Sequence, residues 1–149
     1  MENKPYHIVL ADDDENDRLL FLEAFRQLKL KTIIHTVNDG RELMDYLSQK
    51  DTRLPKLLFL DLNMPRKNGI QCLKEIRGNE NLIDIVVAIY STSASEKDIN
   101  ETFLHGANVY IKKPNDFGLL KQVLNQAVTA AWQYREPPFK ISNFLLRIE

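Results

Sequence analysis

The sequence predicts an α/β domain in which one parallel β-sheet is covered by helices on both faces. Five short apolar runs occur along the chain, each too short for a helix and several rich in β-branched residues. Each run is followed by a longer segment whose apolar residues recur at helical spacing. The resulting order is strand then helix, five times over, and right-handed crossovers make such strands parallel neighbours.

The strands are predicted from where the apolar runs begin and stop. The first run, Ile8 to Ala11, is cut off by three aspartates, as expected for a buried strand that ends at a polar sheet edge. The third run stops in the same abrupt way at Asp61. We expect strands at residues 8–11, 32–37, 57–60, 85–90 and 109–111.

The helices are predicted from periodicity and capping residues. Asp14 precedes the first helical segment as an N-cap, and Gly106 follows the fourth as a C′ residue. We expect helices at residues 15–28, after Asp39-Gly40, after Asn68-Gly69, at 96–105, and along the apolar stripe from Leu120 to Ala131.

Composition excludes several classes of protein. The 149 residues are about one domain, and 44 % of them are hydrophobic, enough for a sizeable core. The 20 basic and 21 acidic residues nearly cancel, so neither a nucleic-acid nor a membrane partner is expected. There is no signal-peptide pattern and no apolar run of the roughly 20 residues that span a bilayer. Cys72 is the single cysteine, so we expect a reduced, cytoplasmic protein without an intrachain disulfide.

Polar side chains follow four of the predicted strands. Asp12 and Asp13 follow the first, Asp61 the third, Ser91 the fourth and Lys113 the fifth. An aspartate after a strand is usually only a turn or capping residue, but the carboxyl ends of parallel strands share one edge, where ligands bind. The sequence therefore predicts that three carboxylates, a hydroxyl and an ammonium group meet at that edge.

This set of groups favours phosphoryl chemistry. Two like charges about 4 Å apart cost roughly 4 kcal/mol at an effective dielectric constant of 20, and a divalent cation removes that cost. An all-oxygen site suits Mg²⁺, with Mn²⁺ as an alternative ion. One carboxylate can act as nucleophile and form an aspartyl-phosphate, while Ser91 and Lys113 bind the phosphoryl oxygens.

The motifs resemble the receiver domain of two-component response regulators. They are Asp12-Asp13, the stretch LDLNMP from Leu60 to Pro65, Ser91-Thr92, and YIKKP from Tyr110 to Pro114. The stretch DLNMPRKNG from Asp61 to Gly69 also resembles the stand-alone regulators that partner bacterial phytochromes and related sensor kinases. The resemblance implies a flavodoxin-like, doubly wound sheet of five parallel strands in the order 2-1-3-4-5, with five helices.

The resemblance also implies a role for each matching residue. Asp61 matches the phosphoacceptor, Asp13 the direct Mg²⁺ ligand, and Asp12 its neighbour that acts through water. Asn63 matches the residue whose backbone carbonyl reaches the metal. The remaining matches are Ser91 for the switch hydroxyl, Tyr110 for the aromatic switch residue, and Lys113 for the invariant lysine.

The implied function is that of a signalling switch and not of a turnover enzyme. A sensor histidine kinase or phosphotransfer protein would phosphorylate Asp61, and a downstream target protein would bind the switched surface. Thr92 and Lys112 depart from the family pattern: Thr92 puts the phosphoryl lifetime in doubt, and Lys112 is expected at the surface facing a partner. Two alternatives stay open, an interaction module that signals without phosphorylation and an aspartate-nucleophile hydrolase. Asn63 argues against the hydrolase, which needs an acid at that position.

The remaining candidates have simpler explanations. The histidines, His7, His35 and His105, have no partner at ligand spacing, and Cys72 is expected to pack inside a helix. Arg66 and Lys67 are solvated or contact an acidic kinase surface.

The receiver is expected to occupy residues 1–132 and a C-terminal tail residues 133–149, which is too short for an output domain. The tail is too apolar to stay free, so it packs on its own domain or forms a homodimer contact.

Overall fold

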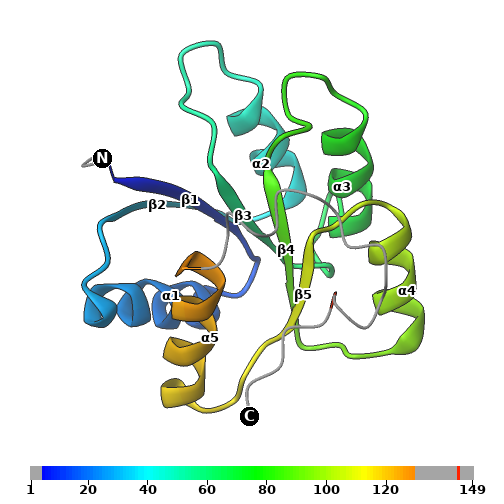
Figure 1. Ribbon diagram of the computed structural model, residues 1–149. Helices are drawn as coiled ribbons and strands as arrows, with labels where there is room; N and C mark the ends of the chain where they lie inside the picture. Colours follow the sequence, from blue (N-terminus) through cyan, green and yellow to red (C-terminus); the bar gives the residue numbers. More distant parts are fainter. Residues whose placement is uncertain (1–4, 130–143, 145–149) are drawn as a thin grey trace.

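A computed structural model of the chain describes residues 5–129 and residue 144. Five strands and five helices alternate along the chain, as predicted (Figure 1). The strands are β1 (Tyr6–Ala11), β2 (Thr32–Val37), β3 (Leu57–Leu60), β4 (Val86–Ser91) and β5 (Val109–Lys112). The helices are α1 (Glu15–Leu28), α2 (Gly40–Leu47), α3 (Gly69–Arg77), α4 (Glu96–Leu104) and α5 (Phe117–Thr129).

All five strands are parallel, and their order in the sheet is β2-β1-β3-β4-β5. The predicted fold class and strand order are therefore confirmed. In Figure 1, α1 and α5 cover one face of the sheet, and α2, α3 and α4 cover the other. Each face has its own apolar cluster, centred on Phe21 and Phe59 on the α1–α5 side and on Leu58 and Leu73 on the opposite side.

The predicted boundaries are close to the observed ones and differ for local reasons. Residue 85 belongs to the preceding turn, because its backbone N–H donates to Leu82, and β4 runs one residue further, through Ser91. Asp14 is the N-cap of α1 and accepts a hydrogen bond from the Asp17 N–H at 3.0 Å, as predicted. Gly106 follows α4 with a φ of +91°, the left-handed conformation expected of a C′ glycine. The predicted apolar stripe continues to Ala131, which lies outside the described residues.

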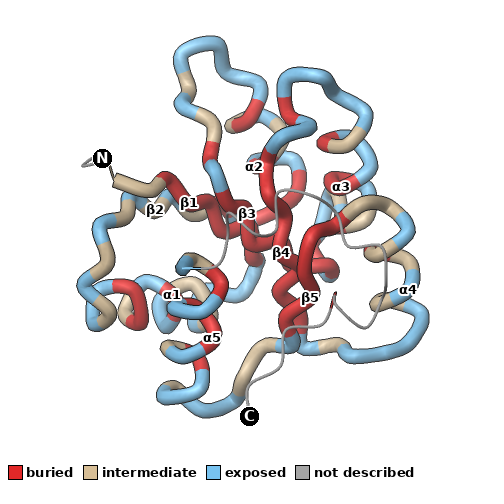
Figure 2. Tube along the Cα trace, in the orientation of Figure 1, coloured by how far each residue is buried: buried red, intermediate tan, exposed pale blue. Residues whose placement is uncertain are grey.

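Burial follows the sheet. Figure 2 shows the strands β3, β4 and β5 as mainly buried and the outer surfaces of the helices as mainly exposed. Every residue of β3 and β4 is buried, the pattern of central strands covered on both faces. Within the described residues, no helix is long and apolar enough to cross a membrane.

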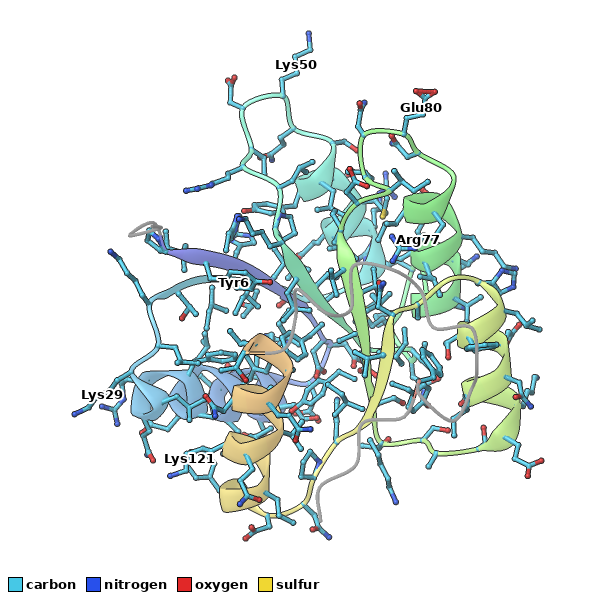
Figure 3. The ribbon with its side chains drawn as sticks, viewed as in Figure 1. Tyr6, Lys29, Lys50, Arg77, Glu80 and Lys121 are labelled. Carbon is cyan, nitrogen blue, oxygen red and sulfur yellow. The ribbon has the colours of Figure 1, made fainter. Side chains whose placement is uncertain are left out.

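Arg77, at the end of α3, ties this helix to the segment that precedes β5 (Figure 3). Its Nε donates to the Gly106 carbonyl at 2.8 Å, and its Nη2 donates to Asn108 Oδ1 at 2.7 Å. Its Nη1 donates to the carbonyls of Ile83 and Ile85 at 3.1 and 3.0 Å. One guanidinium group thus fixes the entry of both β4 and β5 relative to α3.

Candidate functional site

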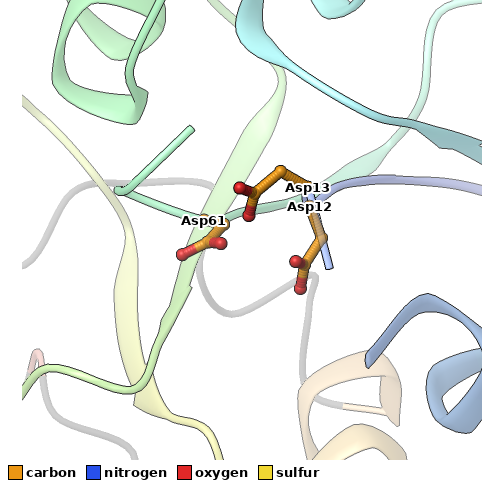
Figure 4. A group of neighbouring side chains, drawn as sticks. All are labelled: Asp12, Asp13 and Asp61. Atoms are coloured by element: carbon orange, nitrogen blue, oxygen red, sulfur yellow. The ribbon is translucent and has the colours of Figure 1, made fainter. Parts of the chain in front are cut away.

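The carboxyl ends of β1 and β3 bring three carboxylates together, as predicted. Asp12, Asp13 and Asp61 each offer an oxygen within 4.8 Å of the others (Figure 4). Asp12 and Asp61 are buried, whereas Asp13 is exposed. Within the described part of the chain this is the one group of acidic, histidine or cysteine side chains spaced for a metal ion.

Backbone pairing explains why these side chains meet. The N–H of Asp61 donates to the Ala11 carbonyl at 3.0 Å, and the N–H of Asp12 donates to the Val37 carbonyl at 3.1 Å. The three strands therefore end in register, with an aspartate following each of two adjacent strands. The loop after Asp61 folds back tightly, because the Gly69 N–H donates to the Leu62 carbonyl at 2.9 Å.

Two glycines permit this close packing of the loop. A Cβ at Gly69 would lie 2.4 Å from the Asp61 carbonyl oxygen. A Cβ at Gly40, the first residue of α2, would lie 1.9 Å from the Lys67 carbonyl oxygen. Any side chain at either position would displace the loop that carries the candidate site.

Lys113 extends from the end of β5 into the carboxylate cluster, as the sequence predicts. Its Nζ lies 2.8 Å from Asp12 Oδ2 and 3.6 Å from Asp61 Oδ2. It also donates a hydrogen bond of 2.8 Å to Asp17 Oδ2, a contact that the sequence pattern does not predict. The same ammonium group lies 5.3 Å from the centre of the Tyr90 ring, within the range of a cation–π interaction.

Asp17 is therefore a fourth carboxylate of the site. It lies in the first turn of α1, and its side chain crosses from that helix to Lys113. The one feature of the sequence that could have indicated Asp17 is its spacing of one helical turn from Asp13. That spacing is not specific, because acidic residues are common at helix N-termini.

Burial and charge repulsion perturb the carboxylates. Burial raises the pKa of Asp61 to about 6, Lys113 opposes this shift, and the charge of Asp12 adds to it. Burial also raises the pKa of Asp12, although Lys113 and the Asp14 N–H act in the opposite direction. Burial lowers the pKa of Lys113, but the carboxylates of Asp12 and Asp17 outweigh it and raise the pKa above its usual value. The single cation thus leaves negative charge uncompensated, which is the condition that a divalent ion relieves.

Asn63 lies in the loop directly after the acidic cluster. Its backbone N–H hydrogen-bonds to the Asp61 carboxylate and lowers the pKa of that group. The structure thus places the backbone of Asn63 beside the Asp61 carboxylate.

Ser91 and Tyr110 are linked through the loop between β4 and α4. Ser91 is fully buried, and its Oγ accepts a hydrogen bond of 3.1 Å from the Ser93 N–H. The Tyr110 hydroxyl donates to the Ser93 carbonyl at 2.9 Å. The Ser91 carbonyl accepts a 2.7 Å hydrogen bond from the Lys113 N–H. Ser91 therefore joins the acidic cluster through the backbone of Lys113, while Tyr110 contacts the same loop from β5.

Cys72 and His7 behave as their simpler explanations predict, whereas Arg66 and Lys67 form ion pairs. Cys72 is buried and its thiol donates to the Gly40 carbonyl at 3.6 Å, and burial raises the pKa of the thiol to about 12. His7 is buried beside Tyr46, away from the acidic cluster. Arg66 lies 3.4 Å from Asp39, the N-cap residue of α2. Lys67 pairs with Glu75.

A parallel sheet with this strand order, an acidic cluster and a lysine at its carboxyl edge defines the receiver class of signalling domains. The response regulator receiver domain family matches residues 8–125, and the chain belongs to this family. Receiver domains act in two-component signalling, partner with histidine kinases and bind a divalent metal ion.

Among the relatives that match most of the chain are Rcp1 and FilR2. The response regulator Rcp1 of Synechocystis sp. is 33 % identical over 138 residues, which cover 87 % of this chain and 90 % of Rcp1. A probable methanogenesis regulatory protein of Methanothrix harundinacea, FilR2, is 30 % identical over 125 residues, covering 82 % of this chain and 81 % of FilR2.

Solved structures agree with this assignment. The phosphorylated cyanobacterial phytochrome response regulator RcpA superposes with a TM-score of 0.78 at 33 % identity, covering 87 % of this chain and 94 % of RcpA. The Mn²⁺-bound form of Rcp1 superposes with a TM-score of 0.76 at 29 % identity, covering 86 % and 94 % of the two chains. The predicted resemblance to stand-alone regulators of the phytochrome type is therefore confirmed.

Proposed function

We propose that this protein is a phosphorylation switch that accepts a phosphoryl group on Asp61. The donor is the phosphohistidine of a sensor histidine kinase or of a phosphotransfer protein. The observation that carries the proposal is the Asp61 carboxylate itself, buried in the acidic cluster with the Lys113 ammonium 3.6 Å away. A downstream target protein then binds the surface whose conformation the phosphoryl group changes.

The residues present fit a bound Mg²⁺ or Mn²⁺ ion. Asp13 and Asp61 would hold it directly, Asp12 through water, and Asn63 through its backbone carbonyl. The donors are all oxygen atoms, and the raised pKa values of Asp12 and Asp61 mark negative charge that Lys113 does not neutralise. When bound, the ion neutralises charge on the transferring phosphoryl group.

The transfer step needs little from the protein beyond position and charge. A carboxylate oxygen of Asp61 attacks phosphorus, a new P–O bond forms, and the P–N bond to the donor imidazole breaks. The leaving imidazole nitrogen keeps the electron pair of that bond. Lys113 contributes positive charge to the phosphoryl oxygens, and Ser91 donates its hydroxyl hydrogen bond to one of them. Movement of Ser91 then alters the β4–α4 loop, to which Tyr110 is hydrogen-bonded.

The receiver unit in this proposal spans residues 1–132, and residues 133–149 form a C-terminal segment. Arg66, in the loop after Asp61, and Lys112, the last residue of β5, are exposed, and we assign them to partner contacts. Lys67 is half-buried through its pairing with Glu75 and is the weaker candidate for such contacts.

The proposal is tested by intact-mass measurement after incubation with acetyl phosphate and MgCl₂. The wild-type protein should gain about 80 Da, the mass of one phosphoryl group, and lose it over time. Asp61→Asn should gain nothing, and chelation of the metal should abolish the gain in the wild type. Asp51→Asn, which alters an exposed aspartate in the α2–β3 connection, is the matched control and should be modified like the wild type.

Two results would contradict the proposal. An adduct that persists in Asp61→Asn would place the phosphoryl group elsewhere. A wild-type protein that never forms the adduct, yet binds its partner equally with and without beryllofluoride, would instead be a phosphorylation-independent interaction module.

A further inference from the structure

Lys113 is enclosed by side chains from three different elements, and none of these side chains is the proposed phosphoacceptor. Asp17, in the first turn of α1, accepts a hydrogen bond of 2.8 Å from the lysine Nζ. Asp12, which follows β1, lies at an ion-pair distance of 2.8 Å, and the centre of the Tyr90 ring of β4 lies 5.3 Å from the same nitrogen. The lysine side chain is 8 % exposed, so these neighbours fix the position of its charge.

Asp61 is the carboxylate that Lys113 contacts least. Its Oδ2 lies 3.6 Å from Nζ, beyond the roughly 3.2 Å at which an N–H···O hydrogen bond ends. The ammonium group has three N–H donors but one unit of charge, which the surrounding carboxylates share. Without a phosphoryl group in the site, Lys113 is therefore held closer to the Asp17 carboxylate than to the carboxylate of Asp61.

The neighbours that hold Lys113 differ in how easily they can release it. Asp17 is fixed at its backbone, because its N–H donates at 3.0 Å to the side chain of Asp14, the N-cap of α1. Its carboxylate, however, is 32 % exposed, so water can solvate it after the lysine has left. The buried ammonium group instead needs another anion, and phosphoryl oxygens on Asp61 would supply one.

We propose that Asp17 is a positioning residue, which holds Lys113 in a resting position until a phosphoryl group on Asp61 binds the lysine. This inference rests on the proposed function and adds a residue that regulates the same site. The phosphoryl oxygens compete with Asp17 for one ammonium group, so a stronger contact between Asp17 and Lys113 lowers the affinity of the site for the phosphoryl group. Removal of the Asp17 charge frees the lysine for the phosphoryl oxygens.

The charge of Asp17 acts in opposite directions on the two ligands of the site. When Lys113 is less neutralised, it repels Mg²⁺ more strongly and attracts the phosphoryl oxygens more strongly. A loss of local structure would weaken the binding of both ligands. A gain in affinity for the phosphoryl group therefore distinguishes the positioning role from a merely structural one.

Beryllofluoride, which takes the place of the phosphoryl group, tests the competition. Isothermal titration calorimetry at saturating MgCl₂ should show that Asp17→Asn binds it about three- to tenfold more tightly than the wild type does. Asp17→Glu restores the charge on a side chain that is longer by one methylene, and it should recover most of the wild-type affinity. Unchanged or weaker binding by Asp17→Asn would overturn the positioning role.

Asp14→Asn is the matched control for the loss of one negative charge. Asp14 lies next to the same helix, and asparagine still caps it, so the affinity for beryllofluoride should change by less than about twofold. Equal tightening in Asp14→Asn and Asp17→Asn would show that net charge alone is responsible, which would overturn the positioning role.

A double-mutant cycle shows whether Asp17 acts through Lys113. In the Lys113→Met background, Asp17→Asn should change the affinity for beryllofluoride by less than about twofold, because the lysine that it would release is absent. If Asp17→Asn tightens binding equally with and without Lys113, Asp17 acts on the phosphoryl group directly, and the positioning role is overturned.

A measurement on the metal-free protein needs neither Mg²⁺ nor a phosphoryl group. The ¹H–¹⁵N NMR signal of the Lys113 ammonium group, assigned by its absence in Lys113→Met, should be visible because burial and the hydrogen bond slow proton exchange with water. Asp17→Asn should speed this exchange at least about threefold, and Asp17→Glu should slow it again. Exchange that is unchanged in Asp17→Asn would show that Asp17 does not hold the lysine, which would overturn the inference.

Failure of the proposed function has a different outcome from failure of this inference. A wild-type protein that forms no adduct with acetyl phosphate and binds no beryllofluoride would overturn both. A wild-type protein that does both, together with an Asp17→Asn variant of the same beryllofluoride affinity, would overturn the role of Asp17 and leave the phosphorylation switch intact.

Discussion

Lys113 is the residue on which the charges of the site converge. Its ammonium group lies 2.8 Å from both Asp12 and Asp17 but 3.6 Å from Asp61, so the resting lysine is held closer to two other carboxylates than to the proposed phosphoacceptor. Asp17 thus neutralises part of a positive charge that would otherwise oppose a metal ion in the acidic cluster. The side chains around Asp61 set both how tightly the cluster binds a cation and how stable the protein is without one.

Replacement of Asp17 by asparagine should weaken Mg²⁺ binding. The variant keeps the shape of the side chain but leaves the charge of Lys113 less neutralised, so we expect the dissociation constant to rise about three- to tenfold. Isothermal titration calorimetry with MgCl₂ measures this change. Asp14→Asn is the matched control, because it removes one charge next to the same helix while asparagine still caps it. If Mg²⁺ binding weakens equally in both variants, the effect comes from net charge alone, and the role given to Asp17 is contradicted.

Replacement of Asp61 by asparagine should stabilise the metal-free protein. Because burial raises the pKa of Asp61 to about 6 in the folded state, ionisation of this group destabilises the fold as pH rises through that value. An amide removes the buried charge, and we expect a gain of about 1–2 kcal/mol in the free energy of unfolding at pH 7.5. Urea denaturation in the presence of EDTA measures it.

The pH dependence of this gain provides its own check. The gain should shrink as pH falls from 6 toward 4, where the folded wild type is already protonated at Asp61. Asp13→Asn, at the exposed carboxylate of the cluster, should give a smaller gain. A loss of stability in Asp61→Asn at pH 7.5 would show that the ionised carboxylate is compensated within the fold.

At the scale of elements, the site depends on how the helices hold the loops at the ends of the strands. The loop after β3 packs closely against Gly40 at the start of α2 and Gly69 at the start of α3, where a side chain would displace it. The segment that leads into β5 is held by Arg77 at the end of α3. α3 therefore connects the acidic cluster at one of its ends with the strand that carries Tyr110, and that Lys113 follows, at the other.

Loss of Arg77 should destabilise this connection strongly. Arg77→Ala leaves the carbonyls of Gly106, Ile83 and Ile85 without their side-chain donor, and we expect a loss of about 2–4 kcal/mol in the free energy of unfolding. Arg77→Lys should recover little, because one ammonium group cannot reproduce the planar fork of donors. Chemical denaturation checks both variants against Arg41→Ala, at an exposed position of α2. Destabilisation no greater than that of Arg41→Ala would show that Arg77 does not hold α3 to the segments that precede β4 and β5.

At the scale of the whole molecule, the sequence predicts the sheet and most of the site because both depend on local pattern. A buried strand must stop where charged residues begin, so Asp12, Asp61 and Lys113 mark the strand ends. Because the carboxyl ends of parallel strands share one edge, the same pattern predicts that these three side chains lie close together. The role of Asp17 is not predicted, because its partner, Lys113, lies 96 residues away in the sequence. The buried position of Phe144 against Phe103 and Tyr110 is not predicted either. The apolar residues around Phe144 in the sequence indicate burial without specifying on which surface.

His7 links stability of the whole fold to pH. It is buried in β1, with its Nε2 3.2 Å from the Tyr46 hydroxyl, and burial lowers its pKa below 6.5, with the charges of Arg53 and His35 acting in the same direction. Because the unfolded chain binds a proton at a higher pH than the folded chain does, the contribution of His7 to stability is complete above pH 6.5 and is lost as pH falls below it. His7→Gln, which cannot titrate, should therefore flatten the decline in unfolding free energy between pH 7.5 and 5.5. His105→Gln, which changes the histidine at the C-cap of α4, is the matched control, and parallel profiles for all three proteins would show that His7 is not the group responsible.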